Sequence, residues 1–321
     1  MSDLKSICVL VPGPMHAPTL ETLKAKFEII QGERGTTDGL SEDQLSSIQG
    51  IASMTGCDAS MMNALAALKI VSNFGVGYDG VDCDAAAQND VMVTNTPDVL
   101  SDEVADTAIG LLINTVRELP AAERWLRNGD WVSKGAYPLT RGTLRGRKMG
   151  IFGLGRIGKA IAHRAEAFSL EISYFGRKPQ DVPYTYYASL VEMAQAVDTL
   201  MVVAPGTPQT ENAVNEEVLS ALGPDGVLIN IGRGSVVNEA ALEAALKNGT
   251  IFAAGLDVFA KEPHVPEGLL TLPNLVALPH VGSASEFTRI AMGQLLVDNL
   301  ASWFSEGKAV TPVPETEHVQ A

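Results

Sequence analysis

The stretch MGIFGLGRIG at residues 149–158 decides the fold, because an apolar run passes there directly into a glycine-rich turn. A segment rich in alanine and isoleucine follows the turn. This order predicts a buried strand, a tight turn and a helix, which together open a βαβ unit. Gly153 would permit the turn, Gly155 would let the backbone approach a ligand, and Gly158 would let the helix pack closely on the strand.

The start of the predicted helix is suited to an anion, because its unpaired N–H groups and its dipole face the turn. A GxGxxG pattern alone is a weak signal, and a glycine-rich turn without a ligand is the alternative. The strand–turn–helix context favours a dinucleotide-binding turn. We therefore predict that the pyrophosphate of a dinucleotide is bound by Gly153, Leu154, Gly155, Arg156, Ile157 and Gly158.

Short apolar runs alternate with helical patterns over most of the chain. Strands are expected at 7–11, 27–30, 51–53, 69–72, 91–94, 149–153, 172–175, 199–204, 226–231, 252–257 and 275–278. Helices are expected at 18–26, 101–127 with a kink or restart at Pro120, 156–168, 190–196, 216–221, 239–247 and 285–304. We expect 128–144 to be a loop or linker and 311–321 to be loose. The rhythm predicts an α/β protein with two doubly wound parallel-sheet domains.

Composition narrows the class of protein further. A chain of 321 residues exceeds one ordinary core, and its 46% hydrophobic content indicates globular domains. A net charge of −15 argues against nucleic acids and anionic membranes as partners. The three cysteines form no metal-ligand pattern, and we predict no metal site. No apolar run is long enough for a signal peptide or a membrane span, so a cytoplasmic protein is expected.

The end of the second strand after the glycine turn bears on the choice of cofactor. An NAD site usually carries an acidic residue about 20 residues beyond the turn. Gly176 occupies that position here, and Arg177 and Lys178 follow it. A carboxylate would repel the 2′-phosphate of NADP, whereas these cations would attract it. A solvated surface turn is the alternative, but the missing acid favours NADPH over NADH.

Charged residues follow three strand-like runs in the second half of the chain, where ligands bind in open α/β sheets. Arg233 directly follows one run, and Asp257 closes the next with Glu262 in the loop beyond. His280 follows the last run. A guanidinium can hold a carboxylate and polarise a ketone, and a carboxylate beside a histidine favours the protonated imidazole of a general acid. Singly these residues have ordinary alternatives, namely a surface ion pair, a helix-start carboxylate and a turn histidine. Together they favour catalysis.

Six stretches of the chain carry a family resemblance. They are NFGVGYDGVD at 73–82, TNTPDVLSDEVADTAIGLL at 94–112, GLGRIGKAIAHRAEAF at 153–168, GVLINIGRGSVVNEAAL at 226–242, AAGLDVFAKEP at 253–263 and LPHVGSAS at 278–285. In them the chain resembles the D-isomer-specific 2-hydroxyacid dehydrogenases over nearly its full length, and within that family the NADP-linked glyoxylate/hydroxypyruvate and hydroxyphenylpyruvate reductases.

The resemblance implies an arrangement of domains. Residues 1–100 and 285–321 would form a flavodoxin-like substrate domain, and residues 101–284 a Rossmann coenzyme domain. The active site would lie in the cleft between them. Members of this family are usually homodimers joined through the coenzyme domain, so a homodimer is expected.

The resemblance also implies roles for matching residues. Arg233 would bind the substrate carboxylate and the reacting carbonyl, and His280 would be the acid/base, oriented by Glu262. The N–H groups of Val76 and Gly77 would hold the carboxylate. The remaining expected contacts are Asp257 at the nicotinamide amide, Ser283 beside the nicotinamide, Thr107 near the cofactor phosphates, Pro205, Thr210 and Ile231 at the cofactor, and Met54 at the substrate.

The predicted function is NADPH-dependent reduction of a small 2-keto acid, such as glyoxylate or hydroxypyruvate, to the D-2-hydroxy acid. Residues 73–82 carry no cation near the carboxylate loop, so a phosphorylated substrate is not expected. Reduction of hydroxyphenylpyruvate or phenylpyruvate is an alternative. A non-catalytic nucleotide-sensing protein on the same scaffold is another, although a sensor would need only the glycine turn. Oxidation of formate or phosphite ranks below these, because the residues it needs are not matched.

Overall fold

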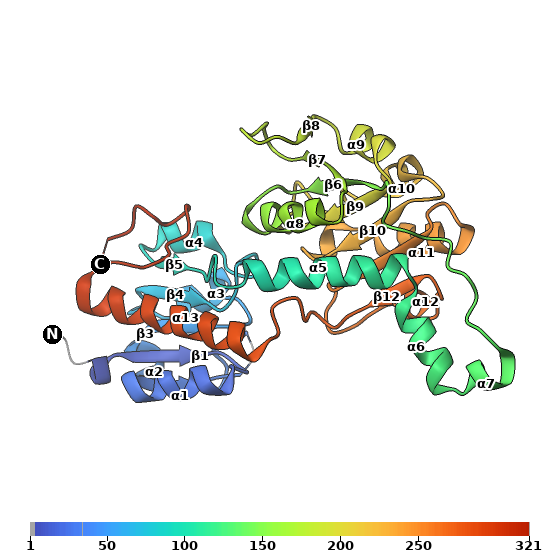
Figure 1. Cartoon of the computed structure of the whole chain (residues 1–321). Coiled ribbons are helices and arrows are strands. Elements are labelled where there is room, and N and C mark those ends of the chain that lie inside the picture. Colours follow the sequence, from blue (N-terminus) through green and yellow to red (C-terminus); the bar gives the residue numbers. More distant parts are fainter. Residues whose placement is uncertain (1–3, 34, 321) are drawn as a thin grey trace. The chain divides into compact units, whose positions relative to one another are not determined.

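The chain divides into two compact units, and the computed structural model describes residues 4–33 and 35–320. Unit 1 comprises Met1–Leu100 and Ser285–Ala321, and unit 2 comprises Ser101–Ala284. Each unit contains one parallel sheet with helices around it (Figure 1). The predicted α/β fold with two parallel sheets is therefore confirmed. Among the described residues, no helix combines the length and hydropathy needed to span a membrane.

The sheet of unit 1 has five parallel strands in the order β2-β1-β3-β4-β5. The strands are β1 Cys8–Val11, β2 Glu28–Gln31, β3 Ile48–Ser53, β4 Ile70–Asn73 and β5 Met92–Thr94. The helical elements are η1 Leu4–Ser6, α1 Ala17–Lys26, α2 Glu42–Ser47, α3 Ala59–Ala64, α4 Cys83–Gln88 and α13 Glu286–Glu306. Helix α13 packs on α1, β3 and β4 (Figure 1), so the last helix returns to the first sheet as expected.

The sheet of unit 2 has seven parallel strands in the order β12-β11-β10-β9-β6-β7-β8. The strands are β6 Lys148–Phe152, β7 Glu171–Phe175, β8 Thr185–Tyr187, β9 Thr199–Val202, β10 Val227–Asn230, β11 Ala253–Leu256 and β12 Leu275–Ala277. The helices are α5 Ser101–Val116, α6 Leu119–Arg127, α7 Asp130–Lys134, α8 Arg156–Ala167, α9 Leu190–Ala196, α10 Glu216–Leu222, η2 Gly234–Val236, α11 Glu239–Asn248 and α12 Glu267–Leu270. The strand order reverses between β6 and β9, and ligands of open α/β sheets bind beyond the strand ends at such a reversal.

Several short elements were not expected from the sequence, among them α2, α3, α4, α12 and β8, each too short to show a helical or strand period. Local caps form three of the helices: the side chains of Ser41, Asp58 and Asp82 each accept a backbone N–H of the first turn. Serine and aspartate at such positions stabilise a helix start without any apolar pattern.

The region after α5 differs in part from the prediction. Pro120 lies in the first turn of α6, and Glu118 before it has φ 53°, so the expected restart of the helix at this proline is confirmed. The expectation of a loop throughout 128–144 is wrong, because α7 forms there after Gly129. Glycine at φ 75° lets the chain turn sharply and begin a new helix within two residues of α6.

The expectation of a loose C-terminal tail is also wrong for its described residues. Val313 and Thr316 are almost completely buried. The N–H of Val313 donates to the carbonyl of Val93 in β5, and Thr94 forms an antiparallel bridge with Pro312. Proline and polar residues suggested a mobile tail, but long-range hydrogen bonds to a sheet edge fix it, and no local pattern reports such bonds.

Candidate active site

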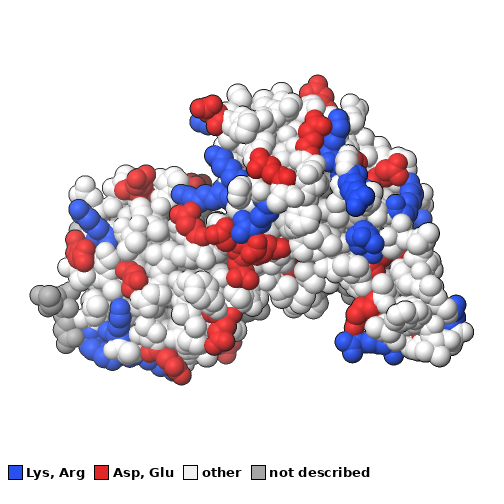
Figure 2. All heavy atoms as spheres, in the orientation of Figure 1, with Lys and Arg blue, Asp and Glu red and all other residues white. Residues whose placement is uncertain are grey.

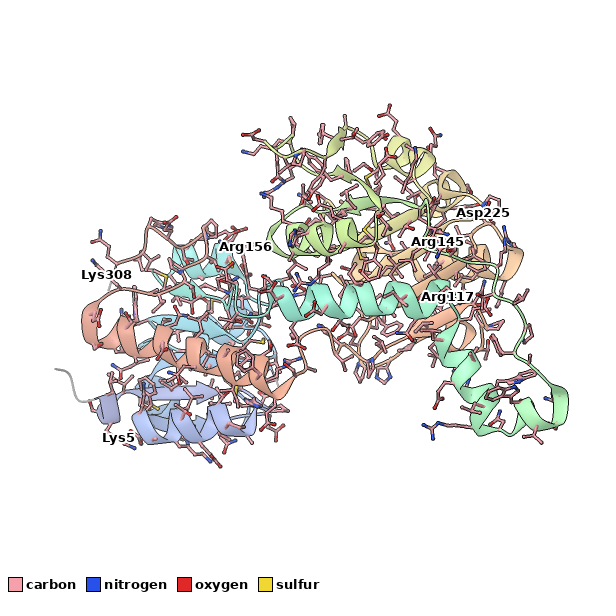
Figure 3. All side chains as sticks on the ribbon, viewed as in Figure 1. Lys5, Arg117, Arg145, Arg156, Asp225 and Lys308 are labelled. Carbon is pink, nitrogen blue, oxygen red and sulfur yellow. The ribbon has the colours of Figure 1, made fainter. Side chains whose placement is uncertain are left out.

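The glycine turn after β6 has the geometry expected of a phosphate-binding turn. Gly153 has φ 100°, and a Cβ there would lie 2.8 Å from the backbone nitrogen of Ala204. A Cβ on Gly158 would collide with the carbonyl oxygen of Gly153. The steric roles predicted for these two glycines are therefore confirmed. A Cβ on Gly155 would meet no described atom within 4 Å, so space is open where Arg156 begins α8 (Figure 3). The dinucleotide contacts themselves stay a prediction.

The loop after β7 presents two cations beside this turn. Arg177 and Lys178 are exposed, and neither forms a hydrogen bond or ion pair with any residue in the described part of the chain. Gln180 donates from Nε2 to the carbonyl of Leu154 at 2.9 Å, which fastens the loop to the glycine turn. Gly176 is half-buried and has no Cβ to occupy the space at the strand end. The loop could therefore offer both cations to an anion bound near the glycine turn.

The turn that carries Arg233 is held by a residue that the sequence did not single out. Asn230 is fully buried, donates to the carbonyl of Arg233 at 2.9 Å and accepts from the N–H of Gly232 at 3.1 Å. Gly234 packs so tightly that a Cβ would overlap the carbonyl of Phe259. These contacts bring the Arg233 turn against the loop after β11. The sequence feature that could have revealed Asn230 is its position as the one polar residue at the end of the apolar strand β10.

His280 and Glu262 form the pair that the sequence predicted. Nδ1 of His280 lies 2.7 Å from Oε2 of Glu262, and Oε1 of Glu262 accepts the N–H of Phe259 at 3.0 Å. Burial raises the pKa of Glu262, but the hydrogen bonds from His280 and Phe259 and the positive charges of His280 and Arg233 outweigh burial and lower that pKa below its ordinary value. Glu262 is thus a stable carboxylate, and it fixes the orientation of the imidazole through one nitrogen.

Asp257 holds the loop that carries His280. It is almost completely buried, and its two carboxylate oxygens accept the N–H groups of Val281 at 2.7 Å and Gly282 at 2.8 Å. Its carbonyl accepts the N–H of His280 at 2.8 Å. Burial raises the pKa of Asp257, although the two backbone hydrogen bonds oppose that change. His280 has φ 53°, a left-handed conformation that costs about 1–3 kcal/mol in a residue other than glycine and that the surrounding contacts must hold.

Thr107 lies on α5 and contacts this loop, since its hydroxyl donates to the carbonyl of Gly282 at 3.2 Å. Ser283 follows Gly282 and is half-buried. A contact of Thr107 with cofactor phosphates stays a prediction, as does the contact of Ser283 with the nicotinamide.

The remaining residues predicted for unit 2 line the ends of β9 and β10. The hydroxyl of Thr210 donates to the carbonyl of Pro205 at 2.6 Å and closes the loop after β9. Ile231 follows β10, is buried, and would lie 3.4 Å from a Cβ on Gly282. These residues therefore border the same sheet edge as the Arg233 and His280 loops, and their contacts with the cofactor stay predictions.

The residues predicted for unit 1 lie just after two of its strands. Val76 and Gly77 belong to the loop after β4, and their N–H groups donate to no acceptor within residues 4–33 and 35–320. Met54 follows β3, and 41% of its surface is exposed. This edge offers backbone donors and a flexible apolar side chain, which suits a carboxylate and a variable substrate tail.

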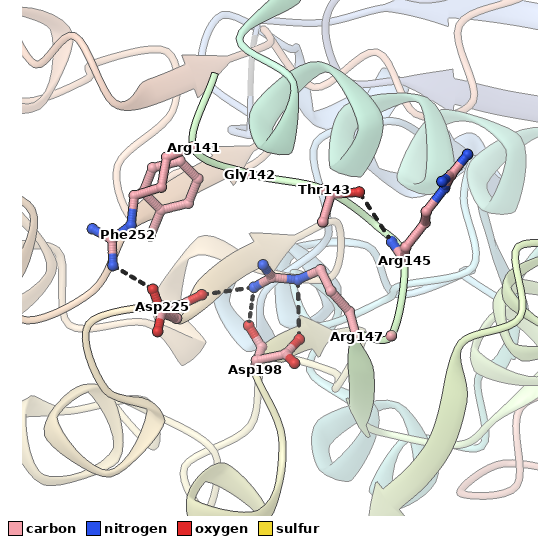
Figure 4. Close-up of a pocket in the computed structure, with 9 residues that line it drawn as sticks. Arg141, Gly142, Thr143, Arg145, Arg147, Asp198, Asp225 and Phe252 are labelled. Carbon is pink, nitrogen blue, oxygen red and sulfur yellow. Dashed lines mark hydrogen bonds and ion pairs between the residues drawn. The ribbon is translucent and has the colours of Figure 1, made fainter. Parts of the chain in front are cut away.

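A pocket at the opposite edge of the unit 2 sheet is lined by charged residues that bind one another (Figure 4). Arg147 is buried and donates to the carbonyls of Asp198 and Asp225, and its Nε lies 3.0 Å from a carboxylate oxygen of Asp198. Arg141 pairs with Asp225 and lies over the ring of Phe252. These residues precede the strands, whereas ligands of parallel sheets bind at the carboxyl ends. We therefore interpret these ion pairs and hydrogen bonds as contacts that stabilise the fold, and not as a ligand-binding site.

The described residues contain no group of three or more His, Cys, Asp or Glu side chains arranged to hold a metal ion.

Comparison with known proteins is consistent with this geometry. A family model described as D-isomer specific 2-hydroxyacid dehydrogenase, NAD binding domain, matches residues 109–282, more than half of the chain. A hydroxyphenylpyruvate reductase of Plectranthus scutellarioides is 46% identical over 97% of this chain and 100% of its own length. A glyoxylate/hydroxypyruvate reductase A of Arabidopsis thaliana is 45% identical over the same shares.

A solved structure shows the same relation in three dimensions. The NADPH-dependent glyoxylate/hydroxypyruvate reductase of Sinorhizobium meliloti, in complex with NADP and malonate, is 56% identical to this chain. It superposes with a TM-score of 0.95, covering 97% of this chain and 98% of that one. With a matching family model and relatives of this identity over almost the whole chain, the protein belongs to the D-isomer specific 2-hydroxyacid dehydrogenases, a family of NAD(P)-dependent oxidoreductases.

Proposed function

We propose that this protein uses NADPH to reduce a small 2-keto acid of the glyoxylate or hydroxypyruvate type to the D-2-hydroxy acid. The observation that carries the proposal is the 2.7 Å contact between His280 and Glu262 at the ligand-binding edge of a dinucleotide-type sheet. The names of the Arabidopsis and Sinorhizobium relatives support the choice of substrate.

His280 is the proposed proton donor. Glu262 engages Nδ1, so Nε2 is the nitrogen that can face a substrate and donate the proton. The proton moves from Nε2 to the ketone oxygen of the substrate as the alcohol forms. NADPH bound at the glycine turn would supply the hydride.

Arg233 and the loop after β4 are proposed to hold the substrate. The guanidinium of Arg233 would bind the carboxylate and polarise the ketone. The N–H groups of Val76 and Gly77 would bind the same carboxylate, which needs donors and gains little from apolar contacts. The open space at Gly155 fits a pyrophosphate at the start of α8.

Preference for NADPH is proposed from Arg177 and Lys178. Both are exposed and lack partners in the described part of the chain, so a 2′-phosphate would not have to displace an existing ion pair. The NADP-bound relative supports this choice. Arginine can grip a phosphate through two hydrogen bonds, which gives the preference a geometric basis.

The test is a panel of 2-keto acids, namely glyoxylate, hydroxypyruvate, pyruvate and phenylpyruvate, each with NADPH and with NADH. We expect loss of the reduced cofactor's absorbance, with the highest kcat/KM for NADPH and a small substrate. Binding of NADPH without turnover of any member would overturn the proposal and favour a nucleotide-sensing protein instead.

Reduction of hydroxyphenylpyruvate is a second candidate. The Plectranthus relative carries that name, and Met54 offers an exposed, adaptable side chain at the end of β3. Phenylpyruvate in the same panel separates the two candidates, because an aryl-specific enzyme would turn it over faster than glyoxylate.

A homodimer joined through α6 and α7 is also proposed. Neither helix has a buried residue, and Leu126, Trp131 and Val132 are 57%, 62% and 95% exposed. Much of the surface of these helices visible in Figure 2 is uncharged. Exposed apolar clusters of this kind mark interfaces in soluble proteins. Light scattering should give twice the mass of the chain, and a monomer at micromolar concentration would contradict the proposal.

A further inference from the structure

The loop after β4 is held in place by hydrogen bonds to the backbone carbonyls of residues 75–77. Nδ2 of Asn73 donates to the carbonyls of Gly75 and Gly77 at 3.3 and 3.0 Å. Nδ2 of Asn95 donates to the carbonyl of Val76 at 2.9 Å. Each of the three successive peptide carbonyls in the loop therefore has a side-chain donor.

These contacts also set the direction of the N–H groups. A trans peptide unit is planar, so its N–H points away from its C=O. The carbonyl of Val76 and the N–H of Gly77 belong to one such unit. By holding that carbonyl, Asn95 aims the Gly77 N–H, which is one of the two donors proposed for the substrate carboxylate.

Asn95 is held in turn by the C-terminal segment, residues 310–316. The carbonyl of Asn95 accepts the hydroxyl of Thr311 at 2.7 Å, and its N–H donates to the carbonyl of Thr311 at 3.3 Å. The Thr311 hydroxyl accepts from Nδ2 of Asn299 at 2.8 Å. Asn299 is fully buried in α13, and its Oδ1 accepts the N–H groups of Val310 and Thr311. A continuous chain of hydrogen bonds thus runs from α13 to the loop after β4.

A second anchor holds the same segment without touching Asn95. The hydroxyl of Thr316 is fully buried and accepts the N–H of Val93 at 3.0 Å. The N–H of Val313 donates to the carbonyl of Val93 at 2.9 Å. The segment is therefore attached to the loop after β4 through Asn95 and through Glu315, which accepts the hydroxyl of Tyr78 at 3.1 Å, whereas the attachment through Thr316 leads only to β5.

We infer that the C-terminal segment is a positioning element for substrate binding, and that Thr311 and Asn95 transmit its support to the Gly77 N–H. This inference rests on the proposed function. Neither residue is proposed to touch the substrate, and both act by fixing a peptide plane. Losing one neutral hydrogen bond in such a chain leaves a buried partner unsatisfied, so the loop should lose order while the rest of unit 1 persists.

Three variants test the inference: Thr311→Val, Thr311→Ser and Thr316→Val. Thr311→Val deletes the hydroxyl at constant shape, and we expect KM for the 2-keto acid to rise about tenfold, with kcat and the KM for NADPH within about twofold. Thr311→Ser keeps the hydroxyl and should restore the wild-type KM. Thr316→Val is the matched control, because it removes a buried hydroxyl from the same segment and should lower the melting temperature without changing KM.

Hydrogen exchange gives a second readout that does not need turnover. Thr311→Val should speed exchange at the amides of Asn95 and Thr96, which donate to Thr311 and Gly75 in the wild type. Thr316→Val should speed exchange at Val93 instead. Equal KM effects of Thr311→Val and Thr316→Val would overturn the inference, and so would wild-type exchange at residues 95–96 in Thr311→Val. If the wild type reduces no 2-keto acid, the proposed function fails, while the exchange result still decides whether the segment supports the loop.

Discussion

The carboxyl ends of the strands differ in kind between the two sheets. In unit 2 they carry charged side chains, with Arg233, Asp257 and His280 following β10, β11 and β12. In unit 1 the loop after β4 offers backbone N–H groups. The carbonyls of the same peptide units accept hydrogen bonds from Asn73 and Asn95. We therefore propose that the same parallel architecture supports acid/base chemistry in one unit and neutral recognition of the substrate in the other. Changes at the unit 2 edge should alter rate and cofactor choice, and changes at the unit 1 edge should alter substrate affinity and preference.

The largest effect is expected from His280→Ala, which removes the proposed proton donor. The kcat/KM for the 2-keto acid should fall about a thousandfold, within the range for loss of a general acid. NADPH affinity, measured by quenching of protein fluorescence, should stay unchanged. His264→Ala is the matched control, because this histidine is exposed in the loop that carries Glu262 and forms no hydrogen bond or ion pair with Glu262 among the described residues. Retention of activity in His280→Ala would remove the acid/base assignment.

A smaller effect is expected from Arg177→Ala. Loss of a charge-assisted contact with the 2′-phosphate should weaken NADPH binding about tenfold to a hundredfold and leave NADH nearly unaffected. The Kd values for both cofactors give the measurement. Arg145→Ala is the matched control, since Arg145 is an exposed arginine at the opposite edge of the sheet (Figures 3 and 4). Equal weakening of NADPH and NADH by Arg177→Ala would contradict the phosphate assignment.

Met54→Ala probes the neutral edge of unit 1. Shortening this exposed side chain should change the ratio of kcat/KM for phenylpyruvate and glyoxylate by about tenfold, the lower end of what one methylene group of apolar contact is worth. The chemistry should be untouched, so the best substrate should keep its kcat. A uniform loss of kcat across the panel would show that Met54 has a different role.

The smallest effect concerns stability in acid. The pKa of Glu262 lies below its ordinary value of 4.5, so its carboxylate contributes stability above that pH, and the contribution is lost as the pH falls through the lower native pKa. Between about pH 5 and about pH 3, the melting temperature of the wild type should therefore fall a few degrees further than that of Glu262→Gln. Parallel losses in the two proteins would show that the contact with His280 adds no stability.

Much of the fold could be predicted from the sequence because parallel strands buried on both faces read as uninterrupted apolar runs. Helices of four to six residues, such as α3 and α12, could not, because they span less than two turns and show no helical period. The fixed C-terminal segment could not either, since Thr316 bonds to Val93 more than two hundred residues away.

The residues of the candidate site also fall into two groups, those that the sequence revealed and those that it did not. Polar residues at strand ends, such as Arg233 and His280, are conspicuous because they directly follow apolar runs, where ligands of open α/β sheets bind. Asn95 and Asn230 were missed, because the sequence does not show which backbone groups their amides bind, although Asn230 closes an otherwise apolar strand. Residues that hold a loop in place become visible only when their partners are known.

The most direct test of the central claim is the pH dependence of kcat/KM for NADPH-driven reduction in the wild type and in Glu262→Gln. Because Glu262 binds Nδ1 of His280 and orients its ring, the variant should have a kcat/KM about tenfold or more below that of the wild type across the profile. Superimposable profiles for the two proteins would contradict the account.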